Sequence, residues 1–139
     1  MPGCVLRIQS KTTKVEVLIK ASGLQPTAIH RKGQPRVSGG TRVSLGSGFN
    51  VTVSSADGTL EKQARDAIRF LKRHAGRLGS MRRCRTFGGM TLDFGLWNRA
   101  TEDSPWPSYR LPATLIELAG KHRIEIALSF YGSESDKAA

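Results

Sequence analysis

The sequence predicts an α+β domain with two layers, in which a four-stranded sheet carries helices mainly on one of its faces. Apolar residues alternate, as in half-buried strands, at residues 49–55, 90–97 and 124–131. Apolar residues also recur at helical spacing over residues 59–78. Strand-like and helix-like segments therefore follow one another along the chain, in the order β-α-β-α-β-α-β.

The first expected strand covers residues 4–9, a short run of residues that favour β-structure. Two interpretations of residues 12–23 compete. The valines and the isoleucine of this segment alternate as in a strand. In contrast, Thr13 and Glu16 have the spacing of a capping box, and Gly23 is suited to end a helix. We favour the helix.

Residues 25–48 are basic and rich in glycine. Two prolines and the Gly39–Gly40 pair interrupt any regular element, so this segment is predicted to be a long loop. Residues 49–55 then alternate between apolar and polar side chains and predict a strand with its apolar side chains facing inward.

Residues 59–78 carry the strongest pattern in the chain and predict a single amphipathic helix. Thr59 is suited to the N-cap position, and Gly79 to ending the helix. The apolar side chains form one stripe that would face a core. Basic residues occupy the opposite side of this helix: Lys62, Arg65, Arg69, Lys72, Arg73 and Arg77.

The remaining segments complete the fold. Residues 90–97 predict a strand, residues 112–120 a helix with Pro112 in its first turn, and residues 124–131 a closing strand. We expect one globular domain at residues 1–132 and a flexible polar tail at residues 133–139.

Short motifs near both ends of the chain carry a resemblance to a known family. The first is Leu24-Gln25-Pro26-Thr27 followed by His30-Arg31-Lys32-Gly33. The others are Leu115-Ile116-Glu117-Leu118-Ala119, Ile124-Glu125-Ile126 and Ser129-Phe130-Tyr131-Gly132. With these motifs the chain resembles a bacterial family of single-domain proteins catalogued as domain of unknown function 4279. The resemblance implies this element order for a bacterial protein, and it implies no activity or catalytic residue.

The charge of the chain points to the class of partner. There are 22 Lys and Arg residues against 11 Asp and Glu residues, a formal net charge of +11. Such an excess attracts nucleic acids, anionic membranes or acidic proteins, although it also serves solubility alone. The predicted polyanion-binding residues are Lys62, Arg65, Arg69, Lys72, Arg73, Arg77, Arg82, Arg83 and Arg85.

We expect a non-enzymatic binding domain that contacts nucleic acid without strong sequence preference. The alternatives are an immunity-type or regulatory module that binds an acidic protein, and a small enzyme. No membrane partner is expected, because the chain lacks an apolar run of about 18 residues and the middle helix needs its apolar face for the core. The pattern predicts no oligomeric state.

The loop around Pro26 offers a second candidate site. Thr27, His30, Arg31 and Lys32 have the chemistry to bind an anion, and a histidine titrates near neutral pH. A local turn organised by Pro26 explains the same residues without a ligand, and we favour that interpretation.

Residue spacing indicates no catalytic centre. The histidines and cysteines lack metal-ligand spacing, so no catalytic residue, metal or cofactor is predicted. Asp93, Glu102 and Asp103 are candidates for acid–base chemistry, although a solvated or arginine-paired carboxylate explains Asp93 more simply. Cys4 and Cys84 predict reduced thiols and a cytoplasmic protein.

Overall fold

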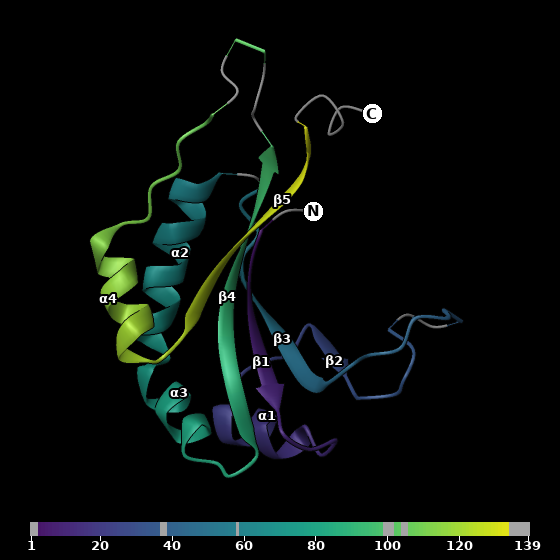
Figure 1. The fold of residues 1–139 in the computed structure, drawn as a ribbon. Coiled ribbons are helices and arrows are strands. Elements are labelled where there is room, and N and C mark those ends of the chain that lie inside the picture. The colour runs from purple at the N-terminus through teal and green to yellow at the C-terminus, as the bar shows by residue number, and fades with distance from the viewer. Residues whose placement is uncertain (1–2, 37–38, 58, 99–101, 104–105, 134–139) are drawn as a thin grey trace.

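The computed structural model describes residues 3–36, 39–57, 59–98, 102–103 and 106–133 (Figure 1). The elements are β1 (Cys4–Ser10), α1 (Glu16–Ser22), β2 (Ala28–His30), β3 (Ser47–Ser54), α2 (Leu60–Arg73), α3 (Ala75–Arg82), β4 (Phe87–Asn98), α4 (Ala113–Lys121) and β5 (Glu125–Ser133). The α+β class is confirmed. The predicted number of strands is wrong, because the described residues form a five-stranded sheet.

The sheet is mixed, with the strand order β2-β3-β1-β4-β5. β1 lies at its centre and pairs antiparallel with both β3 and β4. β4 and β5 are parallel, and α4 lies between them in the chain. A parallel pair needs such a crossover because the chain must return to the same end of the sheet.

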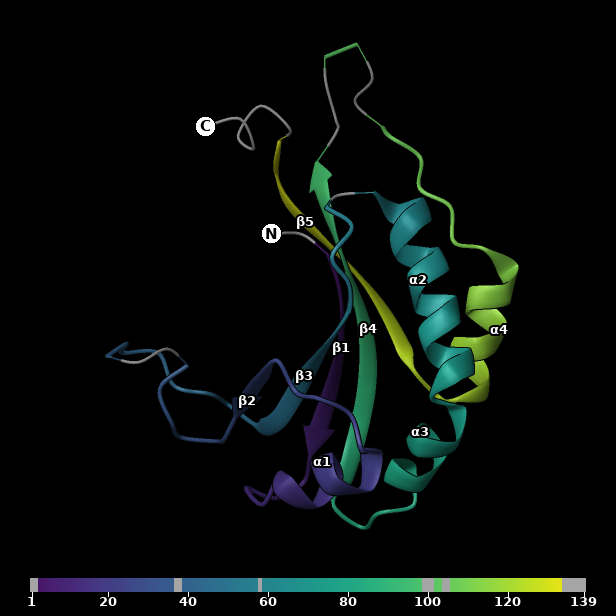
Figure 2. The ribbon, with the colours of Figure 1, turned by 180° about the vertical axis from the view of Figure 1, so that it is seen from behind.

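The helices lie along one face of the sheet, as the two opposite views show (Figures 1 and 2). α2 and α4 run side by side, and α1 contacts α3 near one end of the sheet. The core between the layers includes Phe49, Phe94, Leu71 and Leu115, all fully buried. No helix of the described residues covers the opposite face, which we call the open face of the sheet.

β2 lies within the segment that the sequence predicts to be a long loop. Ala28, Ile29 and His30 pair with Asn50, Phe49 and Gly48 of β3. A three-residue strand is too short to show a period, and Pro26 and Gly33 on either side indicate turns. Pairing with β3 therefore forms this strand, and local sequence does not reveal it.

The prediction of one helix over residues 59–78 is also wrong. α2 ends at Arg73, and His74 has φ −108° and ψ 16°, outside the helical range. α3 then runs from Ala75 to Arg82, so Gly79 lies buried inside a helix and does not end one. Leu78 in α3 is fully buried, as a continuous helix would also require. Apolar spacing is therefore compatible with one helix or two, and it could not reveal the break.

The predicted helix at residues 12–23 is confirmed as α1, with a different start. It begins at Glu16, and no side chain caps its N-terminus, so the capping box of Thr13 does not form. Its end is as predicted: Gly23 has a left-handed φ of 62°, and its N–H donates to the Ile19 carbonyl oxygen at 3.0 Å. Of the predicted tail, Ser133 belongs to β5, and residues 134–139 lie outside the described residues.

Candidate functional site

The outer surface of α2 carries the predicted cations. We define the α2 face as Lys62, Arg65, Arg69, Lys72 and Arg73, all of which are exposed. At about 100° per residue these five side chains fall within an arc of about 100°. Glu61 and Asp66 project on either side of that arc. The buried side of α2 includes Leu60, Ala64, Ala67 and Leu71. This packing against the core directs the cations outward.

The described residues neutralise little of this positive charge. Arg69 Nη1 lies 3.9 Å from Asp66 Oδ1, and the Arg69 side chain is 79% exposed. Such an exposed pair contributes little, typically about 0–1 kcal/mol. Asp66 also accepts a hydrogen bond from Ser54 Oγ at 2.6 Å. Among the residues that the structure describes, no other cation of the α2 face lies within 4.0 Å of a carboxylate.

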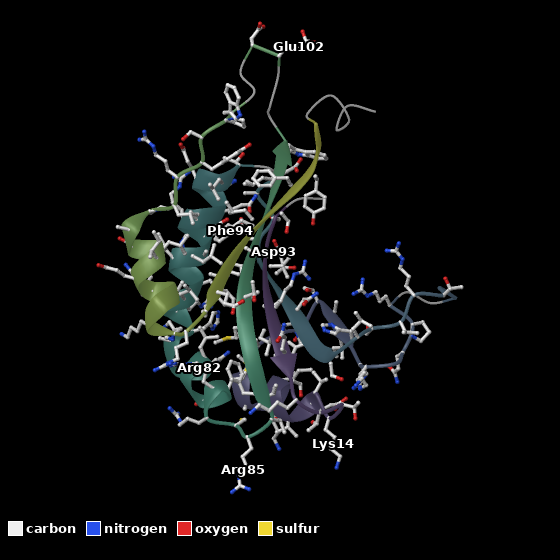
Figure 3. The ribbon with its side chains drawn as sticks, viewed as in Figure 1. Lys14, Arg82, Arg85, Asp93, Phe94 and Glu102 are labelled. Carbon is white, nitrogen blue, oxygen red and sulfur yellow. The ribbon has the colours of Figure 1, made fainter. Side chains whose placement is uncertain are left out.

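The other four predicted cations have different surroundings. Arg77 Nη1 donates to the Gly23 carbonyl oxygen at 3.2 Å and so ties α3 to the end of α1. Arg82 is partly buried, and its Nε has no hydrogen-bond partner in the described part of the chain. Arg83 donates to Ser80 Oγ at 3.3 Å, whereas Arg85 extends from the turn before β4 (Figure 3). The nine residues therefore do not form one uniform stripe.

The open face of the sheet carries a polar network that spans four strands. Arg7 on β1 pairs with Asp93 on β4, with Nε and Nη2 both 3.0 Å from Oδ2. Ser129 Oγ on β5 donates to Asp93 Oδ1 at 2.6 Å. The side-chain amide of Asn50 can be oriented so that its nitrogen and its oxygen both have hydrogen-bond partners. In that orientation the oxygen accepts a hydrogen bond from Arg7 Nη1 at 3.1 Å. Asp93 is thus an arginine-paired acid.

A cavity of about 800 Å³ lies beside this network. Its walls come from β1, β2, β3 and the segment between β2 and β3, whose described residues 31–36 and 39–46 we call the arm. The polar lining includes Arg7, Gln9, His30, Arg36 and Asn50. In Figure 1 the arm extends away from the helical layer, so the cavity and the α2 face lie on opposite sides of the sheet.

The positive charge beside this cavity affects the pKa of His30. Burial lowers the pKa of His30 below 6.5, and Arg7 and Arg36 lower it further by repelling a proton. The lining residues that the structure describes include these two arginines and no carboxylate side chain. A neutral imidazole beside two guanidinium groups is therefore the expected state near pH 7.

The structure does not assemble the predicted loop site. Thr27 Oγ1 donates to the Asn50 carbonyl oxygen at 3.2 Å, and Arg31 forms an ion pair with Glu16. The backbone N–H of Lys32 donates to Ser47 Oγ at 3.0 Å. Of the four predicted residues, only His30 lines the cavity.

Sequence reasoning missed Arg7, Gln9 and Asn50, and it considered Arg36 only as an extension of the cationic surface of α2. Alternation along β1 could have placed Arg7 and Gln9 opposite the buried core side chains. However, nothing in the local pattern indicates which face of the sheet stays open, or that β2 and the arm lie beside β1.

Other chemistries find less support in the described part of the molecule. A cavity of about 490 Å³ near the start of α2 is lined by Glu61 and Arg110 among others. Within the described ranges, no three His, Cys, Asp or Glu side chains gather in a way that could hold a metal ion. None of the helices there combines the length and apolar character needed to span a bilayer.

Comparisons with known proteins place the chain in a family. Neither the curated proteins nor the solved structures gave a significant match. Residues 2–133 match the family described as "Domain of unknown function (DUF4279)". This match covers nearly the whole chain, including every strand and helix of the fold. The chain therefore belongs to the DUF4279 family.

Proposed function

We propose that this protein is a non-enzymatic binding domain that contacts the phosphate backbone of nucleic acid through the α2 face. One observation carries the proposal. Five cations project from a single arc of one helix, and of these five only Arg69 has a carboxylate of the described residues within 4.0 Å. A surface that only served solubility would be expected to mix both signs of charge.

The dimensions of α2 suit a polyanion. Its 14 residues extend about 21 Å at 1.5 Å per residue. Duplex DNA carries about one charge per 1.7 Å, so this length runs beside about a dozen phosphates. Arg and Lys neutralise phosphates and release condensed counterions. Among the described residues no reader motif is evident, and we propose binding with weak sequence preference in a bacterial cytoplasm.

The salt dependence of binding tests this proposal. Fluorescence anisotropy would follow the full chain on a random-sequence DNA duplex and on single-stranded RNA over a salt series. Replacing Arg65, Arg69 and Arg73 together with Gln should reduce the slope of log K against log salt on the duplex by about two to three units. The matched control replaces Lys32, Arg36 and Arg42 with Gln, which removes the same charge from the arm across the sheet.

An equal loss of slope in the control variant would show that net charge, and not the α2 face, governs binding, and would overturn the proposal. So would the absence of binding to both nucleic acids at low salt. An acidic protein as partner, immunity-type or regulatory, is the second candidate, and the same exposed cations favour it. Binding of poly-glutamate without nucleic-acid binding would support that candidate in place of the first.

A further inference from the structure

We propose that the cavity between the open face of the sheet and the arm is a binding site for a small organic anion with a phosphate or carboxylate group. This site is separate from the α2 face, because the sheet lies between them (Figures 1 and 2). The proposal therefore does not depend on the proposed nucleic-acid contact. It keeps His30 from the predicted loop site and combines it with residues of β1, β3 and the arm.

The described lining residues provide donors and positive charge, and the one nearby acid, Asp93, is paired with Arg7. Arg7, Arg36 and His30 contribute cationic or donor groups, and Gln9 and Asn50 contribute amides. None of the described lining residues is Asp or Glu. Hydrogen bonds from charged donors to phosphate or carboxylate are about twice as strong as neutral ones. An anion is therefore the ligand class with which this set of side chains interacts most favourably.

Arg7 is held in place before any ligand arrives. Its Nε and Nη2 contact Asp93, which is 12% exposed and is itself bonded by Ser129. Its Nη1 bonds the Asn50 amide. A guanidinium has five N–H groups, so at least two remain without a partner among the described residues. This preorganisation lowers the entropic cost of ligand binding.

Arg36 is positioned by backbone contacts within the arm. Its N–H donates to the Arg42 carbonyl oxygen at 2.9 Å, so the two sides of the arm are joined beside it. Ser44 N–H donates to Gln34 O, and Gly33 N–H donates to Ser44 O, both at 2.9 Å. These bonds connect the arm as a ribbon that ends at β3. The backbone of Arg36 is thus held within this ribbon, and its side chain is exposed.

The register of the sheet places Gly48 between His30 and Gln9. Gly48 of β3 pairs with His30 on one side and with Gln9 on the other. Two strand spacings, about 10 Å, separate these two residues, and the residue between them has no side chain. An added Cβ at Gly48 would lie 2.1 Å from the Ile8 carbonyl oxygen, so no larger residue fits there.

The cavity is larger than an inorganic anion needs. Its volume of about 800 Å³ falls within the range of about 300–1,000 Å³ that is usual for small-molecule sites. Ala28 and Leu45 add apolar surface to the lining, and Leu45 is 84% exposed. A ligand that joins an anionic group to an apolar ring or chain would use both parts of the site.

Nuclear magnetic resonance titrations of the labelled full chain test the proposal. The probes are phenyl phosphate, benzoate and uncharged benzyl alcohol, all at constant ionic strength. One or both anions should produce saturable shifts at His30, Gln9 and Ser44 and raise the pKa of His30, whereas benzyl alcohol should not. The tighter of the two anions identifies the group that the site prefers.

Two variants on the arm make the test specific. Arg36→Gln should weaken binding about tenfold or more, since it removes a charged donor from the cavity. Arg42→Gln removes the same charge from an exposed neighbour that does not line the cavity, and it should leave the affinity nearly unchanged. The proposal is overturned if neither anion gives saturable shifts at millimolar concentration. It is also overturned if both variants weaken binding equally, or if the shifts fall on the α2 face.

Discussion

Gln63 Nε2 on α2 donates a hydrogen bond to the Gly95 carbonyl oxygen of β4, at 2.8 Å, across the interface of helix and sheet. The same nitrogen donates to the Ala56 carbonyl oxygen at 2.9 Å, and the side chain is fully buried. These hydrogen bonds of Gln63 thus fix the position and the rotation of α2 relative to β4, where the rest of the contact is apolar. This contact helps to hold the α2 face toward solvent.

Replacing Gln63 should destabilise the protein. Gln63→Leu would leave the Ala56 and Gly95 carbonyl groups without this donor, and we expect a loss of about 1–3 kcal/mol in the free energy of unfolding. Urea denaturation measures this loss, and Lys62→Ala on the exposed side of the same turn is the control. A Gln63→Leu loss no greater than the control's would show that this contact contributes no stability.

Two glycines of one segment should respond differently to a methyl group. Gly48→Ala would place Cβ 2.1 Å from the Ile8 carbonyl oxygen, and the backbone would have to move. We expect a loss of about 1–3 kcal/mol or more. Gly46→Ala meets no atom within 4 Å and should change stability by less than about 0.5 kcal/mol. Thermal denaturation of both variants would contradict this account if their midpoints were equal.

The two thiols should differ in reactivity. Burial raises the pKa of Cys4, and Asp93 and Asp66 add to this effect. Cys84 is only partly buried. In the native protein Ellman's reagent should therefore modify Cys84 first and Cys4 only after unfolding. Cys84→Ser should abolish the native-state reaction, and an unchanged reaction in that variant would refute the assignment.

The three histidines should make stability fall in mild acid. Burial lowers the pKa of His30, His74 and His122 below 6.5. Arg7 and Arg36 repel a proton at His30, Arg73 and Arg77 at His74, and Arg82 and Lys121 at His122. Between the lowered values and 6.5 the unfolded chain binds more protons than the folded protein. The free energy of unfolding should therefore decrease as the pH falls through this window.

Histidine resonances provide the direct measurement. Each Hε1 should titrate below 6.5 in the folded protein and near 6.5 in urea. Urea denaturation should then show that the free energy of unfolding falls less between about pH 8 and pH 5 in His30→Gln than in the unchanged chain. Folded-state pKa values at or above 6.5 would contradict the prediction.

The long periodic segments were predictable because each displays its pattern within its own residues. α2 was expected from apolar spacing, and its cations follow from the same helical wheel. β4 and β5 were expected from alternation. The break at His74 could not be predicted, because Leu71 and Leu78 keep a helical spacing whether the helix continues or restarts. β2 was missed because three residues show no period.

The sequence pattern alone was sufficient to predict the class of fold and a cationic face on α2, since helical spacing and charge are local properties. Tertiary structure decided that this face stays largely unpaired among the described residues, that Arg77 bonds the Gly23 carbonyl oxygen and that Arg82 is partly buried. It also decided the cavity of the open face. Arg7 lies far from His30 and Arg36 in the sequence, and only the strand order and register bring it beside them.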